Sequence, residues 1–398
     1  MTVRAALGLN STAEHFSAIG SGSPRHLAFR LGGRTHAIGI WASRVARGER
    51  SLAQVMAAVN GARREEEARA LRGRGATPST VAGDGGGDKS SGRRLSEVGA
   101  ISQSAVMWNS LSRMSLPGPH TQCARGWGRP WVAFMWDDVF ASMQLAAGRA
   151  PLSRALAYSQ ITTLLKGRLT DGMIPNMWMP NWISFDRSGP PLAALGVRLL
   201  HARYNDDWLV HLLYDDAAAW INWFWRTRRL APLQLVALGS DAGAMASRYN
   251  VPSLRMAMLE SGMDNSPMYD GATFDNRTHL MRLYDVGMSS MLVSELRHLA
   301  HLARSPSIWA HETAAAREQK QREAREHERR ASEMGRLISA QMWNDPLGAF
   351  TNVHANGTHS TRVSPTSFYP MLARVATDRQ AVRMVREWLV NPRRFCVR

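Results

Sequence analysis

Four segments of the chain place carboxylates beside aromatic side chains. The first, residues 129–140 (RPWVAFMWDDVF), has Trp136 directly before Asp137 and Asp138. An aromatic face can contact the apolar side of a sugar ring, and a carboxylate accepts hydrogen bonds from hydroxyl groups. Capping of a helix by Asp137 or Asp138 is the alternative for one of the two acids. Trp136 and Asp137 are therefore candidate substrate-binding residues.

The second segment, residues 171–191 (DGMIPNMWMPNWISFDRSGPP), contains four prolines, which exclude a continuous helix. We expect a long irregular loop, and such loops with their own aromatic residues are usually functional in compact domains. Packing of the tryptophans against the rest of the fold is the alternative. The candidate substrate-binding residues of this loop are Asn176, Trp178, Asp186 and Arg187.

The third segment, residues 259–271 (LESGMDNSPMYDG), has three carboxylates within eleven residues. Carboxylates that lie close together raise one another's pKa, as a general acid requires. Helix capping would explain one or two of them. Glu260 and Tyr269 join the candidate substrate-binding residues. The fourth segment, residues 342–352 followed by 364–373, is rich in aromatic and turn residues, but its chemistry is nonspecific.

The sequence lacks motifs for metals, cofactors and nucleophiles. Its 13 histidines never occur in an HExxH motif, and neither Cys123 nor Cys396 lies in a CxxC motif or in the setting of a nucleophile. There is no GxSxG motif, and no glycine-rich nucleotide-binding motif follows a predicted strand. We therefore expect no metal site and no cofactor.

The net charge of +17 would ordinarily suggest nucleic acid or a membrane surface as a partner. All but three of the basic residues are arginine, however, and they are scattered instead of forming a stripe interleaved with aromatic residues. A GC-rich coding sequence produces the same bias. No apolar run approaches the roughly 20 residues of a membrane span. We expect neither nucleic acid nor a membrane as partner, and the oligomeric state stays open.

The first part of the chain differs from the rest in composition. Residues 1–50 contain seven arginines and two glutamates, which is typical of an organelle transit peptide, with a disordered leader as the alternative. The compartment stays open. Residues 52–71 are compatible with a short helix, and residues 76–92 form a Gly/Ser-rich linker with little to bury. We expect residues 1–94 to be leader and linker, and residues 95–398 to form one domain.

Beyond about residue 95, apolar residues recur at three- and four-residue spacing, which predicts successive helices separated by short loops. The strongest patterns lie in residues 139–148, 151–167, 191–204, 206–229, 288–304 and 378–390. Residues 313–336 predict a solvated helix with many ion pairs, and no alternating stretch is long enough to predict a sheet. Asp206 or Asn205 is expected to cap one helix, and Ser364 with Pro365 to open another. Helices with candidate site residues in the connecting loops are typical of an all-α, α/α toroid.

Together the segments resemble glycoside hydrolase family 63, particularly its branch related to mannosylglycerate hydrolase and mannosyl-oligosaccharide glucosidase. Eight segments match in the family's order: residues 105–109, 134–140, 172–176, 184–191, 260–271, 284–291, 342–350 and 364–373. The resemblance implies an (α/α)6 toroid of the six-hairpin glycosidase type. It also implies hydrolysis of an α-glucosyl or α-mannosyl bond in a small carbohydrate or oligosaccharide, with inversion of configuration.

The same resemblance assigns roles to individual residues. It implies that Asp264 is the general acid, and that Trp136 and Asp137 lie in the sugar subsite. The candidates Asn176, Asp186 and Arg187 would line the same site by their loop positions.

Two departures from the family pattern limit these implications. Gly189 stands where relatives commonly have glutamine, so a hydrogen bond to substrate is expected to be missing or supplied elsewhere. An inverting mechanism also needs a second carboxylate roughly 6.5–9.5 Å from the acid, and in the family this base lies C-terminal to the part that matches Phe395. We therefore expect a C-terminally truncated glycosidase with an incomplete toroid. A catalytically inactive, carbohydrate-binding remnant is the alternative, and a trehalase-like specificity fits the 260–267 segment less well.

Overall fold

The computed structural model describes residues 105–106, 110–111, 120–121, 132–148, 151–179, 182–241 and 253–394. The expected leader, short helix and linker in residues 1–94 lie outside this part of the chain. Two compact units are present, residues 1–109 with 147–154, and residues 110–146 with 155–398. Every candidate site residue belongs to the second unit, which is described below.

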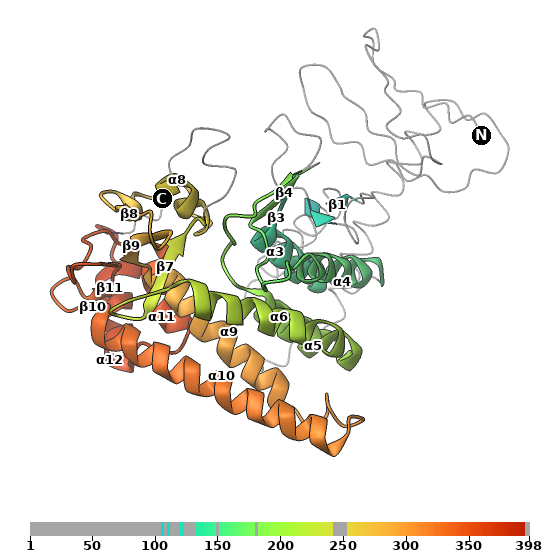
Figure 1. Ribbon diagram of the computed structural model, residues 1–398. Coiled ribbons are helices and arrows are strands. Elements are labelled where there is room, and N and C mark those ends of the chain that lie inside the picture. Colours follow the sequence, from blue (N-terminus) through green and yellow to red (C-terminus); the bar gives the residue numbers. More distant parts are fainter. Residues whose placement is uncertain are drawn as a thin grey trace, which may run out of the picture. The chain divides into compact units, whose positions relative to one another are not determined.

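Helices dominate this unit, and each helix expected from the apolar periodicity is present (Figure 1). The longer helices are α3 (Met135–Ala146), α4 (Pro151–Lys166, whose first residues belong to the other unit), α5 (Ala193–Tyr204), α6 (Asp207–Thr227), α9 (Val286–Arg304) and α10 (Ala314–Gln341). Shorter elements are α8 (Ser253–Leu259), α11 (Tyr369–Leu372), α12 (Asp378–Met384), the 3-10 turns η1 (Pro267–Tyr269) and η2 (Pro365–Phe368), and the π-helical turn η3 (Val385–Leu389). Among the described residues, no helix is both long enough and apolar enough to cross a membrane.

Helix α9 is the centre of the packing, because it contacts α5, α6, α10 and α11. It begins where the Oδ1 atom of Asp285, at the N-cap, accepts a hydrogen bond from the backbone N–H of Met288 at 2.7 Å. Leu292, Leu296 and Leu299 are fully buried along it. Burial of each such side chain contributes about 1.5–3 kcal/mol, so α9 holds the neighbouring helices that carry the site.

Helix α10 differs from the solvated helix that its composition predicts. Ion pairs cover one side, as expected, but Ala331, Met334 and Ile338 are fully buried on the other. This side packs along α9, and the two helices lie next to each other in Figure 1. The few apolar residues of α10 recur at helical spacing and form a buried side. A prediction based on the overall charge of the segment does not detect this spacing.

Short strands are present that the sequence did not predict. A five-stranded antiparallel sheet has the order β12-β9-β7-β6, with β8 also paired to β9. Its strands are β6 (Arg229–Leu230), β7 (Leu235–Gly239), β8 (Phe274–Asp275), β9 (Leu280–Tyr284) and β12 (Val353–His354). All five residues of β7 are buried, so its sequence is a continuous apolar run without the alternation that identifies a half-exposed strand.

A second sheet joins two of the candidate segments. It is antiparallel, with the order β3-β4-β5, and comprises β3 (Ala133–Phe134), β4 (Met177–Met179) and β5 (Trp182–Ile183). Phe134 pairs with Met177, and Trp178 pairs with Ile183. The segment 171–191 therefore contains a β-hairpin where an irregular loop was expected. The remaining strand pairs are β1 (Ser110–Leu111) with β2 (His120–Thr121), and β10 (Trp343–Asn344) with β11 (Ala349–Phe350).

The expected caps have mixed outcomes. Ser364 caps η2 through its side chain, and Pro365 occupies the first turn, as predicted. Asp206 precedes α6 but makes no side-chain cap bond; its carboxylate accepts instead from the hydroxyl of Tyr158. Helix α3 starts at Met135, so Asp137 and Asp138 lie in its first turn and neither is the N-cap residue. The capping interpretation of this pair is wrong, although both carboxylates are favourably placed in the field of the helix N-terminus.

Candidate active site

Backbone contacts bring the start of α3 and the 171–191 segment together. The N–H of Met135 donates to the carbonyl oxygen of Asn176 at 3.1 Å, and the N–H of Asn176 donates to the carbonyl oxygen of Arg187 at 3.2 Å. Asn176 is buried, and its side-chain amide lies 3.2 Å from the position of a Cβ built on Gly189. The space that a side chain at 189 would need is therefore occupied by Asn176 and by Met135, whose Cε lies 3.3 Å away.

The third segment touches α3 through Trp136 and Gly262. A Cβ built on Gly262 would lie 2.3 Å from the Trp136 ring, so the half-buried indole rests directly on the Gly262 backbone. The Trp136 ring also meets the ring of Phe140 edge to face, with 5.6 Å between centroids, and Phe140 is 45% exposed. Trp136, which directly precedes the half-buried Asp137, thus contacts the third segment at Gly262, two residues before Asp264.

Asp264 is half-buried in the turn that follows α8. Its backbone carbonyl accepts a hydrogen bond from Arg255, whose Nη2 also donates to the side-chain oxygen of Asn265 at 2.8 Å. Burial raises the pKa of the Asp264 carboxyl, while the positive charges of Arg255 and Arg187 act in the opposite direction. The carboxyl therefore keeps its proton to a higher pH than an exposed aspartate, as a proton donor requires.

Arg187 and Asp186 form a buried pair beside this turn. The Nη1 atom of Arg187 lies 3.0 Å from both carboxylate oxygens of Asp186, and 3.5 Å from the sulfur of Met256 on α8. Asp186 Oδ2 also accepts a hydrogen bond from the hydroxyl of Ser240 at 2.9 Å. The Arg187 charge also acts on the Asp264 carboxyl, where it lowers the pKa against the effect of burial.

Glu260 has no exposed surface. Its two oxygens accept from three donors, the backbone N–H groups of Ser188 and Gly239 and the Nε of Arg228. This geometry supports a role in holding the segments together. A direct contact between Glu260 and a sugar stays a prediction, and it would require one of these bonds to be exchanged.

Tyr269 and Trp178 are also buried. The Tyr269 hydroxyl donates to Asp285 Oδ2 at 2.9 Å, which ties η1 to the N-terminus of α9. Burial and the Asp285 charge raise the pKa of Tyr269 well above its usual value. The indole of Trp178 packs on Gly167, where an added Cβ would lie 2.5 Å from the ring. This contact agrees with the packing alternative for the tryptophans, and it does not bring Trp178 together with Asp264.

Three residues that the sequence did not indicate help to build the site: Ser188, Arg228 and Asp285. Ser188 and Arg228 bind Glu260, while Asp285 binds Tyr269. An N-cap pattern could have identified Asp285, since an acid precedes the apolar helix α9. Arg228 is one arginine among many in the chain, and only tertiary structure distinguishes it. Among the described residues, no group of acidic, histidine or cysteine side chains could hold a metal ion.

Comparison with known structures identifies the fold. A GH63 mannosylglycerate hydrolase from Thermus thermophilus, in complex with glucose, is similar with a TM-score of 0.50 and 17% identity over 72% of this chain and 76% of that one. The neutral trehalase of Saccharomyces cerevisiae gives a TM-score of 0.51 and 15% identity over 70% of this chain and 57% of that one. These neighbours are (α/α)6 toroid enzymes, which confirms the expected all-α fold class.

Sequence comparison identifies the family. No curated protein matches the chain. Residues 130–398, which include every candidate site residue, match the family described as the mannosylglycerate hydrolase MGH1-like glycoside hydrolase domain. This match covers more than half of the sequence and begins at the start of the segment that carries Trp136 and Asp137. The chain therefore belongs to the MGH1-like glycoside hydrolase family.

Proposed function

We propose that the protein hydrolyses an α-glucosyl or α-mannosyl bond with inversion of configuration, and that Asp264 is its general acid. The observation that carries this proposal is the turn of residues 262–264, in which Gly262 lies against the Trp136 ring and burial raises the pKa of the half-buried Asp264 carboxyl. Support for a small mannosyl or glucosyl substrate comes from the similar mannosylglycerate hydrolase in complex with glucose.

In the proposed reaction, the protonated Asp264 donates its proton to the glycosidic oxygen as the bond to the anomeric carbon breaks. A water molecule attacks the anomeric carbon from the opposite face, and a second carboxylate must accept its proton; the family resemblance implies that this base lies C-terminal to the part that matches Phe395, so it is not among the residues assigned here. Trp136 would contact the apolar face of the sugar ring, and Asp137, Asn176, Asp186, Arg187 and Tyr269 would line the subsite. Burial around Asp264 favours its neutral form before the reaction, and the nearby arginines stabilise the carboxylate that forms as the proton leaves.

The test compares leaving groups in Asp264→Asn. An asparagine keeps the shape of the side chain but has no proton to donate, so hydrolysis of glycosides with poor leaving groups should fall by about 10²–10⁴-fold. Glycosyl fluorides and dinitrophenyl glycosides leave without protonation, so their hydrolysis should fall much less. Equal losses for both kinds of substrate would show that Asp264 does not act as the acid.

The stereochemical part of the proposal has its own measurement. Proton NMR during hydrolysis of an α-glycoside should detect the β-anomer of the sugar first, before mutarotation. Initial release of the α-anomer would contradict inversion and would leave the role of Asp264 to be decided by the leaving-group comparison.

A further inference from the structure

Glu260 joins three segments that lie far apart in the sequence. Its Oε1 accepts from the backbone N–H of Ser188 at 2.9 Å, and its Oε2 accepts from the N–H of Gly239 at 2.7 Å. Ser188 directly follows Arg187, Gly239 ends β7, and Glu260 itself follows α8 and precedes Asp264 by four residues. One carboxylate therefore holds the loop of the buried arginine, the sheet and the turn of the candidate acid.

Arg228 neutralises this carboxylate in the interior. Its Nε lies 3.1 and 2.8 Å from the two Glu260 oxygens, and its Nη1 donates to Asp241 at 2.9 Å. The guanidinium carbon lies 4.5 Å from the centroid of the Trp223 ring. A buried carboxylate without a partner is strongly unfavourable, and a geometrically good pair with additional backbone donors offsets that cost. The buried Glu260–Arg228 pair thus anchors the three segments to one another.

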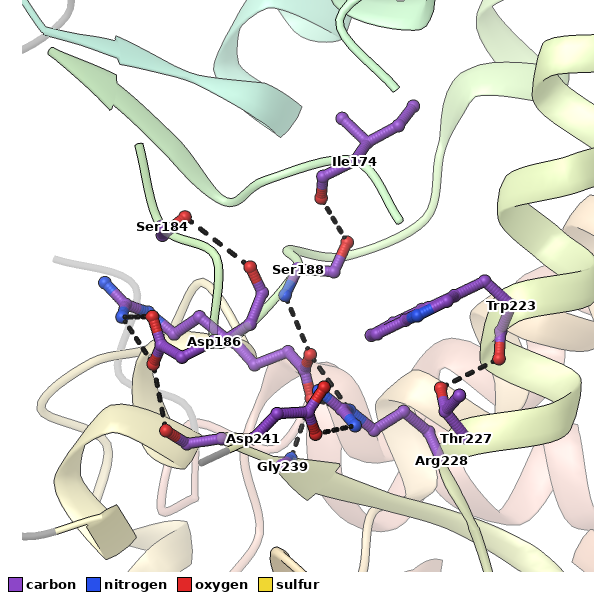
Figure 2. Close-up of polar contacts among 12 residues, drawn as sticks. Ile174, Ser184, Asp186, Ser188, Trp223, Thr227, Arg228, Gly239 and Asp241 are labelled. Atoms are coloured by element: carbon purple, nitrogen blue, oxygen red, sulfur yellow. Dashed lines mark hydrogen bonds and ion pairs between the residues drawn. The ribbon is translucent and has the colours of Figure 1, made fainter. Parts of the chain in front are cut away.

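The stretch Asp186–Arg187–Ser188 is fixed at both of its ends. At one end, the Ser188 hydroxyl donates to the carbonyl of Ile174 at 2.7 Å and accepts from Trp220 Nε1 at 2.9 Å. At the other end, Asp186 accepts from the Ser240 hydroxyl at 2.9 Å, and its backbone carbonyl accepts from the N–H of Asp241 at 2.7 Å. Figure 2 shows the contact between the Ser188 hydroxyl and the Ile174 carbonyl. Arg187 lies between the two fixed ends.

Close approach makes the arrangement intolerant of displacement. A Cβ built on Gly239 would lie 2.7 Å from the Arg228 guanidinium carbon, and one built on Gly262 would lie 2.3 Å from the Trp136 ring. The backbone of Gly239 therefore contacts the Arg228 side chain directly, and the backbone of Gly262 contacts the Trp136 side chain in the same way. A shift of Glu260 would move Gly262, and with it the turn that carries Asp264.

We propose that Glu260, paired with Arg228, is a positioning residue that sets the location of the Arg187 guanidinium relative to the Asp264 carboxyl. The inference rests on the proposed role of Asp264 as general acid. Burial raises the pKa of Asp264, and the charges of Arg255 and Arg187 both lower it. If Arg187 moves away, the Asp264 pKa rises, and the pH at which activity is lost on the alkaline side rises with it.

The experiment measures kcat, KM and the pH profile of Glu260→Gln in the full chain. Glutamine has a similar shape, but its amide nitrogen cannot accept, so one of the bonds to Ser188 or Gly239 is lost. Since a displacement of about 1 Å can cost about 10²-fold in rate, we expect kcat to fall by about that factor. KM should change much less, and the alkaline limb should move to higher pH.

Glu295→Gln is the matched control. Glu295 is also fully buried and also accepts from two backbone N–H groups, those of Ala194 at 2.6 Å and Leu195 at 3.0 Å. It makes no contact with the segments that carry Arg187 and Asp264 in the described hydrogen-bond network. We expect this variant to lose stability while keeping kcat per folded molecule and the wild-type alkaline limb.

Ser240→Ala is a second, milder variant, and it tests the proposed positioning of Arg187 if Glu260→Gln does not fold. It removes the hydroxyl that holds Asp186, so it should move the alkaline limb in the same direction by a smaller amount. If Glu260→Gln does not fold, an unchanged alkaline limb of the pH profile in folded Ser240→Ala would overturn the inference.

The remaining outcomes separate the two proposals. If Asp264→Asn keeps full activity, the proposed function fails whatever Glu260→Gln does. If Asp264→Asn is inactive but Glu260→Gln loses activity only in proportion to its folded fraction, as the Glu295→Gln control should, then Glu260 is purely structural and the inference fails alone.

Discussion

At the scale of single residues, Gly262 is where the candidate acid's turn meets the candidate sugar platform. Its φ of +69° lies in the left-handed region, and the space beyond its Cα is filled by the Trp136 ring. Gly271, in the same segment, has a φ of +76° with nothing within 4 Å of a built Cβ. The two glycines therefore share a backbone conformation but differ in what a methyl group would contact.

This difference gives a prediction for Gly262→Ala, with Gly271→Ala as its control. Both substitutions force an alanine into the left-handed region, at a cost of roughly 1–2 kcal/mol in the free energy of unfolding. Only Gly262→Ala also displaces the Trp136 indole, so it alone should raise KM for a glycoside and shift the tryptophan fluorescence. Urea unfolding and steady-state kinetics measure both effects. Equal KM values in the two variants would show that Trp136 has no part in binding substrate.

At the scale of elements, α5 obtains its N-terminal cap from another helix. Leu192 stands at its N-cap position and makes no side-chain cap bond. The Glu295 carboxyl, from the middle of α9, accepts from the N–H groups of Ala194 and Leu195 instead. Helix N-termini leave several N–H groups without partners, and here a buried side chain of α9 satisfies two of them.

The buried cap makes stability depend on pH. Burial raises the pKa of Glu295 from its usual 4.5 to about 8, while the two backbone N–H groups oppose the rise. The folded protein therefore binds this proton more tightly than the unfolded chain does. The resulting stabilisation is fully present below about pH 4.5 and is lost as the pH rises toward about 8, by at most about 1.4 kcal/mol per pH unit. Denaturant unfolding at several pH values should show this slope in the wild type and its absence in Glu295→Gln. Parallel pH dependences would contradict the assignment.

Elements differ in how far the sequence predicts them. Helices α3 to α6 and α9 follow from apolar spacing because each buries one side against neighbours. Strand β7 could not be found in this way, since both of its faces are buried. The hairpin of β4 and β5 was hidden by the prolines that flank and interrupt its segment. Each also pairs with a strand that is distant along the chain, β7 with β9 and β4 with β3, and local patterns do not reveal such pairings.

At the scale of the whole molecule, local sequence patterns predict the residues of the site but not the contacts between them. Trp136, Asp264 and Arg187 could be nominated because each lies in a motif whose residue types suggest sugar chemistry. The contact of Trp136 with Gly262 and the joining of Ser188, Gly239 and Arg228 by Glu260 could not, because they depend on tertiary structure. The sequence thus predicts which residues are chemically capable, and the fold determines which of them meet.

The organisation of the chain gives the last prediction. The family match covers residues 130–398, and every contact that we assign to the site lies between residues 135 and 285. We expect a chain that starts at residue 95 to keep the thermal unfolding midpoint and the kcat of the full-length protein, because residues 1–94 are predicted to be leader and linker. Calorimetry and kinetics on the two chains, purified in parallel, measure this. A lowered midpoint together with lower activity would show that the first 94 residues are part of the folded enzyme, and that the domain boundary lies earlier than the composition indicates.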